Sequence, residues 1–212
     1  MRIHRFTGGI AQTNGYLLSQ PGQGQAVLID APEGVWEGIE PVLRKEGLQL
    51  AELWLTHGHF DHLLGAPELV RRTGAKVRAH PDDRILIENP EVMKEFAGVQ
   101  FRLEPLRVDA WVGQGDRLEA AGLSAMVRHV PGHCPGSVLF YFPAEARAFV
   151  GDAIFNGSVG RTDFPGGSFE VLERSIRAQI YTLPDGTVLC PGHGPETTVE
   201  REKASNPYVP AA

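Results

Sequence analysis

The feature that most constrains this chain is a cluster of ionisable side chains that directly follows an apolar run. Leu53-Trp54-Leu55 reads as the end of a buried strand, and the next residues are Thr56-His57-Gly58-His59-Phe60-Asp61-His62. Three imidazoles and one carboxylate thus lie within six residues at the rim of the expected sheet. A solvated polar turn is the alternative interpretation, but it explains a lone histidine better than this set. We expect the fold to be organised around the cluster.

The residue types and their spacing indicate metal binding. Side chains two positions apart in an extended segment point to the same side, so His57 and His59 can share one ion. Asp61 and His62 follow at the start of a helix expected over 61–73, with Asp61 as its N-cap, and they can face a second position nearby. Imidazole and carboxylate are ligands of Zn²⁺, Fe and Mn²⁺. Two divalent ions are therefore the expected cofactors, with zinc preferred over iron or manganese.

The composition is that of an ordinary globular protein. The 212 residues are 42% hydrophobic and 22% charged, enough for one sizeable α/β domain or two fused halves. A net charge of −6 argues against a nucleic-acid partner. Neither a signal peptide nor the roughly 20-residue apolar run of a membrane span is visible. The two cysteines, Cys134 and Cys190, do not suggest a disulfide framework, so we expect a cytoplasmic protein with no membrane partner.

The pattern of elements predicts an α/β fold with two similar halves, roughly 1–105 and 106–212. Strands are expected over 3–6, 13–19, 25–30, 52–55, 76–79, 117–119, 124–129, 137–142, 148–150 and 187–189. Helices are expected over 34–46, 61–73, 81–96, 169–180 and 196–206. Each half runs from strands to helices and back, which suggests two sheets packed together with helices on their outer faces.

Three glycine-containing turns, each after an expected strand, carry further candidate ligands. The first contains Gly132-His133-Cys134-Pro135-Gly136, and the last contains Pro191-Gly192-His193-Gly194-Pro195. Between them, Asp152 follows Phe149-Val150-Gly151. Any one of these is often merely structural. Together with the first cluster they form a strong set of seven.

This set of residues resembles the metallo-β-lactamase superfamily over essentially the whole chain. The resemblance implies that residues 1–212 form one domain, a four-layer αβ/βα sandwich with a two-metal site at the edge between its sheets. It implies that His57, His59 and His133 hold one metal. It further implies that Asp61, His62 and His193 hold the other, with Asp152 bridging the two. Asp61 would also be catalytic, because it would orient the hydroxide that such a pair of ions provides at neutral pH.

The loop after Asp152 resembles that of the glyoxalase II branch, the hydroxyacylglutathione hydrolases, especially their short bacterial members. The resemblance implies hydrolysis of a small thioester, S-2-hydroxyacylglutathione, to a 2-hydroxy acid and a thiol. Arg161 stands at the basic position of this loop and suits a substrate carboxylate. Phe155 and Asn156 are the other expected substrate contacts. Asp163 is a departure, since longer members carry an aromatic hydroxyl there, and only 19 residues follow His193, too few for their C-terminal helical domain.

Two other functions remain open. Persulfide dioxygenases share the Gly-Arg-Thr-Asp loop and use a single iron, so an iron-dependent oxygenase is the alternative chemistry. A non-catalytic metal-binding or redox module is the alternative from another class, although none of the seven ligands is lost here. A β-lactamase is disfavoured because Cys134 follows a ligand histidine. We expect His80 and His129 to support the site at most, and the cysteines to pack in the core.

Overall fold

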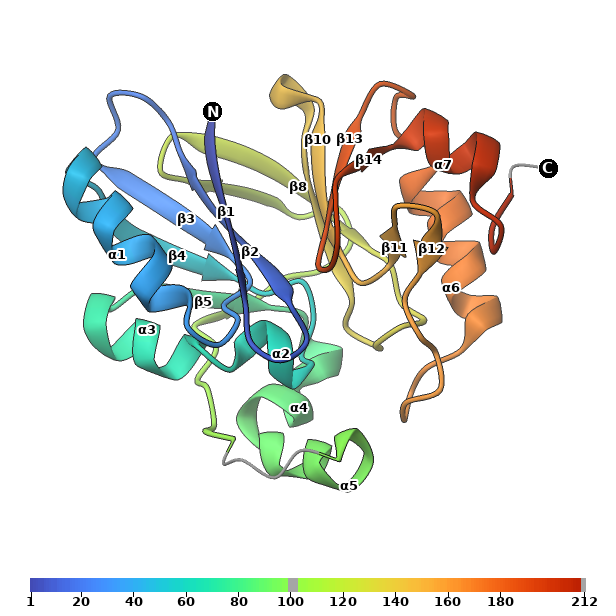
Figure 1. Ribbon diagram of the computed structural model, residues 1–212, viewed down its shortest axis with the longest axis horizontal. Helices are drawn as coiled ribbons and strands as arrows, with labels where there is room; N and C mark the ends of the chain where they lie inside the picture. Colours follow the sequence, from blue (N-terminus) through green and yellow to red (C-terminus); the bar gives the residue numbers. More distant parts are fainter. Residues whose placement is uncertain (99–102, 211–212) are drawn as a thin grey trace.

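The computed structural model describes residues 1–98 and 103–210, which form two six-stranded sheets packed together (Figure 1). In strand order, the first sheet contains β1 Arg2–Gly8, β2 Thr13–Ser19, β3 Gln25–Ile29, β4 Gln49–Trp54, β5 Lys76–Ala79 and β6 Ala110–Trp111. The second contains β14 Thr197–Thr198, β13 Val188–Pro191, β10 Arg147–Gly151, β9 Val138–Phe142, β8 Leu123–His129 and β7 Arg117–Ala120. A small hairpin follows β10 and consists of β11 Ile154–Phe155 and β12 Ser158–Val159.

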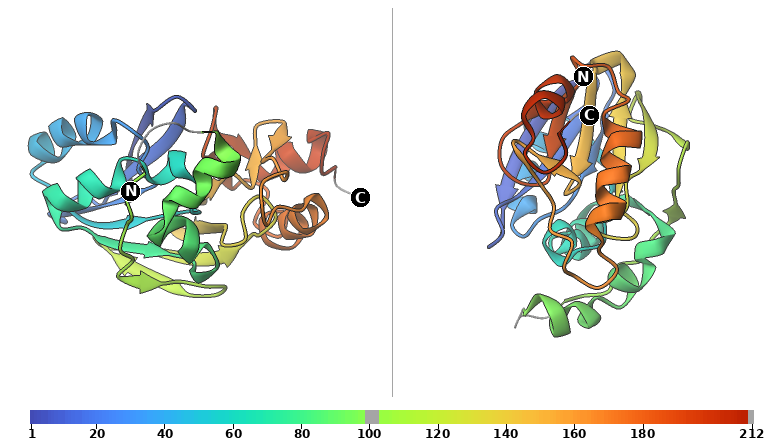
Figure 2. Two further views of the ribbon diagram at one scale, coloured as in Figure 1. Left: turned by 90° about the horizontal axis from the view of Figure 1, so that it is seen from below. Right: turned by 90° about the vertical axis from the view of Figure 1, so that its right-hand side faces the viewer.

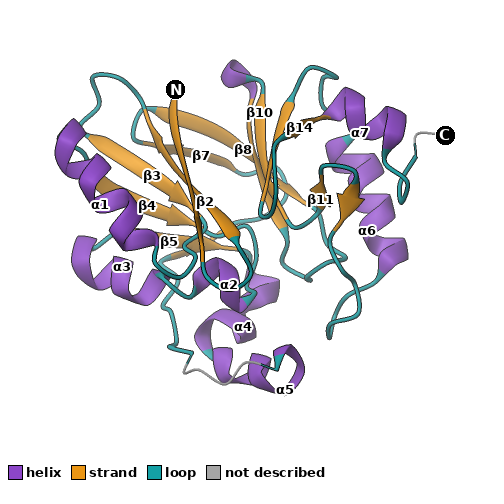
Figure 3. Cartoon of the chain, in the orientation of Figure 1, coloured by secondary structure: helices purple, strands orange, loops and turns teal. Residues whose placement is uncertain are grey.

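Helices lie outside the two sheets, so the expected four layers are present (Figures 2 and 3). Beside the first sheet are α1 Val35–Glu46 and α3 Ala66–Thr73, and beside the second are α6 Phe169–Ser175 and α7 Val199–Ser205. The shorter helices are α2 Phe60–Leu63, α4 Arg84–Glu88 and α5 Lys94–Ala97. The 3₁₀ turns are η1 Pro81–Asp83, η2 Pro90–Met93 and η3 Pro143–Glu145, and the π-helical turn η4 Ile176–Ile180 continues α6.

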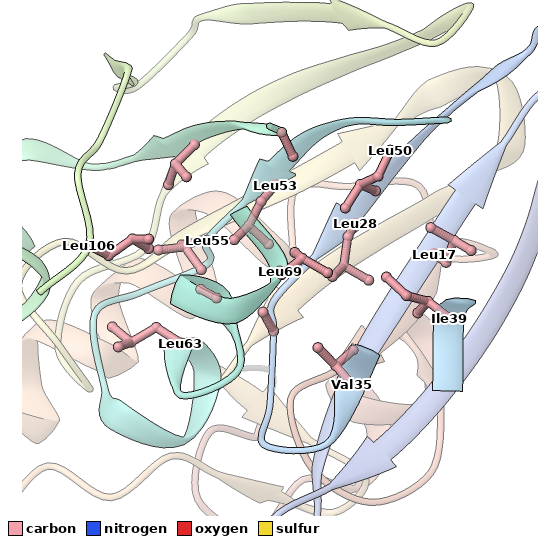
Figure 4. Close-up of a cluster of buried hydrophobic side chains, with 14 of the residues drawn as sticks. Leu17, Leu28, Val35, Ile39, Leu50, Leu53, Leu55, Leu63, Leu69 and Leu106 are labelled. Atoms are coloured by element: carbon pink, nitrogen blue, oxygen red, sulfur yellow. The ribbon is translucent and has the colours of Figure 1, made fainter. Parts of the chain in front are cut away.

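Alternation along the strands builds the layers, because successive side chains point to opposite faces. On β2, Tyr16 faces the second sheet and meets Phe149 edge-on, with ring centroids 5.0 Å apart. Its neighbour Leu17 faces the helices and packs in the cluster that contains Val35 and Ile39 (Figure 4). Burying one such side chain contributes about 1.5–3 kcal/mol. Both faces of the central strands are therefore fixed, which leaves their ends to position the site.

The helix expected over 61–73 is wrong as a single element, since the structure has α2 and α3 separated at Gly65. The Gly65 amide donates to the Ala31 carbonyl at 2.9 Å, and a Cβ at this position would come within 2.4 Å of the Pro32 carbonyl oxygen. This close approach breaks the helix. The N-cap of α2 is His59, not Asp61, whose Oδ2 instead accepts a hydrogen bond from Thr13 Oγ1 at 2.6 Å.

Other expected elements differ mainly at their ends. The strands expected over 13–19 and 76–79 match β2 and β5, whereas the helix expected over 81–96 is a series of short helical segments. The last turn of the helix expected over 169–180 is π-helical, and residues 197–198 of the last expected helix form β14. Strand β6 pairs with β5, so the first sheet extends to residue 111, beyond the expected half at 1–105. Residues 99–102 and 211–212 lie outside the described residues.

Candidate metal centre

Loops that follow four strands meet at one edge of the two sheets and carry the seven expected ligands. The segment after β4 supplies four of them, two from the loop and two from α2, and the loops after β8, β10 and β13 supply one each. Backbone hydrogen bonds tie the two sheets together at this edge. The Val138 amide donates to the Thr56 carbonyl at 2.8 Å, and the Asn14 amide donates to the Gly192 carbonyl at 2.7 Å. The structure thereby brings all seven side chains to one place.

The seven side chains form two groups with an aspartate between them. The inner group is His57, His59 and His133, and the outer group is Asp61, His62 and His193. Within each group, one potential ligand atom per residue lies within 4.8 Å of the others. Asp152 contacts both groups, since its Oδ2 is 3.6 Å from His133 Nε2 and 3.2 Å from His193 Nε2. Its Oδ1 is 3.2 Å from His62 Nε2.

The cluster fits a pair of cations because several of its inward-facing atoms lack hydrogen-bond partners. Within the described part of the chain, His57 Nε2, His62 Nε2 and Asp152 Oδ1 are buried and form no hydrogen bond. Burying a neutral polar group in this way costs roughly 2–7 kcal/mol, and a charged one costs more. Divalent cations held by these atoms would remove that penalty, and nitrogen and oxygen are the donors that zinc, iron and manganese accept.

Asp30, at the end of β3, fixes which nitrogens of two histidines face the centre. Its Oδ2 accepts hydrogen bonds from Thr56 Oγ1 at 2.7 Å and from His62 Nδ1 at 2.8 Å. Because Thr56 donates its hydroxyl proton to Asp30, Thr56 Oγ1 can only accept from His57 Nδ1, which lies 3.1 Å away. His57 and His62 therefore keep a proton on Nδ1, so Nε2 is the nitrogen that each of them presents to a metal.

Backbone carbonyls orient two more histidines in the same way. His133 Nδ1 donates to the Arg161 carbonyl at 2.7 Å, and His193 Nδ1 donates to the Ala11 carbonyl at 3.0 Å. Both rings thus turn Nε2 inward. His59 is the exception, because its Nδ1 faces the centre, 2.9 Å from His133 Nε2.

Glycine permits the close approach that this edge requires. A Cβ at Gly192 would lie 2.1 Å from Asp152 Oδ1 and 2.6 Å from His62 Cε1. A Cβ at Gly160 would lie 2.9 Å from His133 Nδ1. A larger residue at either position would displace the ligands, which explains the glycine that precedes His193.

Burial keeps His57 and His59 neutral. It lowers the pKa of His57 well below the usual range and lowers that of His59 to about 3. For Asp152, nearby histidines affect the pKa more than burial does. Burial acts to raise the pKa of Asp152, but the charge of His62 and the close His193 ring outweigh it and hold this pKa well below the usual range. Neutral imidazole and ionised carboxylate are the forms that bind metals.

The outer group holds protons that a metal would displace. Burial favours neutral imidazole, but the surrounding carboxylates outweigh it and raise the pKa of His62 well above the usual range and that of His193 to about 10. The pKa of Asp61 is about 2, because the charge of His62 and the hydrogen bond with His193 overcome the effect of burial. Metal binding at this group is therefore coupled to proton release.

A cavity of about 390 Å³ opens onto the cluster. Its walls include the aromatic rings of Phe60, Phe155 and Phe164, together with Arg161. The Arg161 guanidinium lies 3.9 Å from the Phe164 ring centroid and donates twice to Asp163, from Nε at 2.7 Å and from Nη2 at 2.6 Å. The expected basic residue is thus at the cavity, but it already has a carboxylate partner.

The expected substrate contacts differ in their placement. Phe155 lines the cavity, as does Arg161. Asn156 is not among the residues that line it, and a contact between this side chain and the substrate stays a prediction. Its Nδ2 donates to the Glu196 carbonyl at 3.1 Å, because the β11–β12 hairpin turns this side chain toward the segment after β13.

Sequence reasoning missed residues that support the cluster without belonging to it. Asp30 carried a usable signal, since it is a carboxylate at the end of an expected strand, as Asp152 is. Asp83 carried none, because it lies in a segment expected to be helical.

The two histidines expected to support the site at most lie beside the His133 turn. His129 Nε2 donates to the Pro135 carbonyl at 2.8 Å, and its ring stacks on His80 with centroids 4.1 Å apart.

The family model of the metallo-β-lactamase superfamily matches residues 8–193. The chain belongs to this superfamily. It is 37% identical over 187 residues to hydroxyacylglutathione hydrolase GloC of Haemophilus influenzae, and the alignment covers 87% of each chain. Within the described residues, no helix is long and apolar enough to cross a membrane.

Solved structures extend the likeness. BLEG-1, a B3 metallo-β-lactamase, has a TM-score of 0.90 and 33% identity over 98% of this chain and 99% of its own. TTHA1623 in a di-iron-bound form has a TM-score of 0.85 and 36% identity, covering 97% and 99%. ETHE1 from Myxococcus xanthus has a TM-score of 0.83 and 27% identity, covering 99% and 84%. The fold is therefore the metallo-β-lactamase fold, and the superfamily match together with the likeness to GloC supports a metallo-hydrolase.

Proposed function

We propose that this chain is a metal-dependent hydrolase that cleaves a thioester, S-2-hydroxyacylglutathione, to a 2-hydroxy acid and a thiol. The observation that carries the proposal is the pair of ligand groups sharing Asp152 beside a cavity. The inner group would hold one ion, the outer group the other, and Asp152 would bridge them. Bound there, two divalent cations supply a nucleophile at neutral pH and an electrophile for the carbonyl. Zinc is the first candidate, and iron and manganese suit the same donors.

Asp61 is proposed as the catalytic carboxylate. Its Oδ2 accepts a hydrogen bond from Thr13 and lies 3.3 Å from His193 Nε2, and its side chain is 16% exposed at the cavity. An ionised carboxylate in this place can accept a hydrogen bond from an attacking water and orient it toward the substrate carbonyl.

The cavity suits a small thioester with an anionic thiol part. The rings of Phe60, Phe155 and Phe164 can enclose the reacting acyl group and exclude bulk water. Arg161 can bind a substrate carboxylate if it exchanges its partner Asp163 for the substrate. The 37% identity to hydroxyacylglutathione hydrolase GloC supports the choice of a glutathione thioester.

The test is hydrolysis of S-lactoylglutathione by protein loaded separately with zinc, iron or manganese, followed through release of free thiol. We expect turnover that chelation abolishes and added metal restores. Metal-bound protein without turnover of this or a neutral thioester would contradict the proposal and favour the non-catalytic module.

A second candidate is a persulfide dioxygenase, and one observation favours it. His57, His62 and Asp152 form a buried set of two histidines and one carboxylate whose potential ligand atoms lie within 4.8 Å of one another, the ligand type of non-haem iron oxygenases. Oxygen uptake by the iron-loaded protein with glutathione persulfide, in the absence of thioester hydrolysis, would favour this function over the hydrolase.

A further inference from the structure

A single buried carboxylate joins the two loops that supply the inner group. Asp83, the last residue of η1, is fully buried. Its Oδ2 accepts a hydrogen bond from the Gly58 amide at 2.7 Å, and its Oδ1 accepts from the Gly136 amide at 2.6 Å and from Cys134 Sγ at 3.1 Å. Gly58 lies between His57 and His59, and Cys134 follows His133. All three inner histidines are therefore adjacent in sequence to a group bound to Asp83.

The packing around Asp83 leaves little freedom to either loop. A Cβ at Gly136 would lie 2.5 Å from Asp83 Cγ, and a Cβ at Gly58 would lie 3.0 Å from Asp83 Cβ. The same turn makes a second contact with the His133 loop, because His80, its N-cap, stacks on the His129 ring that donates to the Pro135 carbonyl. Movement of η1 would thus move both ligand loops.

The chemistry of the three partners requires an acceptor at this position. Two are backbone amides and the third is the Cys134 thiol, whose Sγ lies 3.1 Å from Asp83 Oδ1 and donates to it. An ionised carboxylate accepts from all three donors. An asparagine cannot, because its NH₂ group would face one of the donors and leave a buried polar group unpaired.

We propose that Asp83 is a positioning residue that holds His57, His59 and His133 at the spacing needed to bind the inner metal ion. It acts through the Gly58 amide on one loop and through Gly136 and Cys134 on the other. The inference rests on the proposed metal centre, and it assigns to Asp83 a role in the affinity of one ion but not of the other.

The test measures zinc dissociation constants for both ions by competition with a chromogenic chelator, in the wild type, D83N and D109N. Asp109 is the control for an aspartate that accepts from a backbone amide far from the cluster, since its Oδ2 accepts from the Val77 amide at 2.9 Å at the β5–β6 end of the first sheet. We expect D83N to bind one zinc ion roughly 10–100-fold more weakly, with the second ion and the control unchanged. Thermal unfolding of the metal-free proteins is recorded in parallel.

If the wild type binds fewer than two zinc ions, the proposed metal centre fails, whatever Asp83 does. If the wild type binds two and D83N binds both with wild-type affinity, the positioning role is overturned, even when the metal-free D83N unfolds at a lower temperature. If D83N does not fold, Cys134 variants test the same role, because Cys134 Sγ donates to Asp83. We expect C134S, which retains a donor, to bind the inner ion more tightly than C134A, and equal affinities would overturn the role.

Discussion

The inner and outer groups share Asp152 but differ in how they meet solvent. His57, His59 and His133 are 2%, 5% and 3% exposed. In the outer group, the side chains of Asp61 and His193 are 16% and 26% exposed at the cavity, and only His62 is fully buried. The inner position is thus enclosed, whereas the outer position faces the space where a substrate would bind.

The contacts that hold the two groups in place also differ, and they fix the inner group more firmly. The inner histidines are braced by the Thr56 hydroxyl, the Arg161 carbonyl and the buried Asp83 between their loops. The outer group depends in part on the turn between β1 and β2. There the Ala11 carbonyl accepts from His193, and Thr13, the first residue of β2, donates to Asp61. The difference teaches that two neighbouring ions on one sheet edge need not be equivalent. We expect the inner ion to be held more tightly and the outer ion to exchange first.

Removal of the shared ligand should have the largest effect. Asp152→Ala deletes the one carboxylate that contacts both groups, so both ions should be weakened and kcat should fall by at least about 10³-fold, the scale of losing a preorganised charge-stabilising group. Metal content and thioester hydrolysis measure this. Retention of near wild-type kcat would show that Asp152 does not connect the groups.

Single histidine substitutions test directly whether the inner and outer groups bind separate ions. His133→Ala should lose the inner ion, and His193→Ala should lose the outer ion while retaining one tightly held ion, with kcat lowered on the order of 10² in each. The check is the number of ions per chain after gel filtration against a weak chelator. The weak chelator should also remove the weakly held outer ion from His133→Ala, so this variant should retain no ion and His193→Ala should retain one. Equal numbers of ions in the two variants would contradict the difference in affinity between the inner and outer groups.

Asp30 should affect both ions, in contrast to Asp83. Asp30→Asn places a donor against His62 Nδ1 or Thr56, and Thr56 in turn orients His57. We expect roughly 10–100-fold weaker binding of both ions. Thr56→Ser is the control, because it keeps the hydroxyl group. Loss of the outer ion alone would show that the Asp30 substitution does not act on His57 through Thr56.

The smallest expected effect concerns the mouth of the cavity. Asp163→Asn frees Arg161 from its ion pair, so the KM for the glutathione thioester should fall by roughly two- to five-fold, as expected for an exposed ion pair. The KM for a thioester of an uncharged thiol serves as the control and should not change. Equal changes for both substrates would mean that Arg161 does not bind the substrate carboxylate.

Much of this arrangement was predictable from the sequence, because its signals are local. The run from Thr56 to His62 and the three glycine-containing turns identify the seven side chains, and apolar alternation identifies strands such as β2. The supports were less predictable, because their partners are distant. Asp83 contacts Gly58 and Gly136 across 25 and 53 residues, and no local pattern encodes such pairings. The break at Gly65 and the placement of Asn156 likewise depend on tertiary contacts with Ala31 and Glu196.

The metal-to-protein ratio during stepwise chelation tests the central claim most directly. The account predicts about two ions per chain at the start, loss of one at low chelator concentration, and loss of the second only at much higher concentration, with hydrolysis falling as the first ion leaves. A chain that binds no more than one ion, or that hydrolyses thioester at full rate after exhaustive chelation, would contradict it.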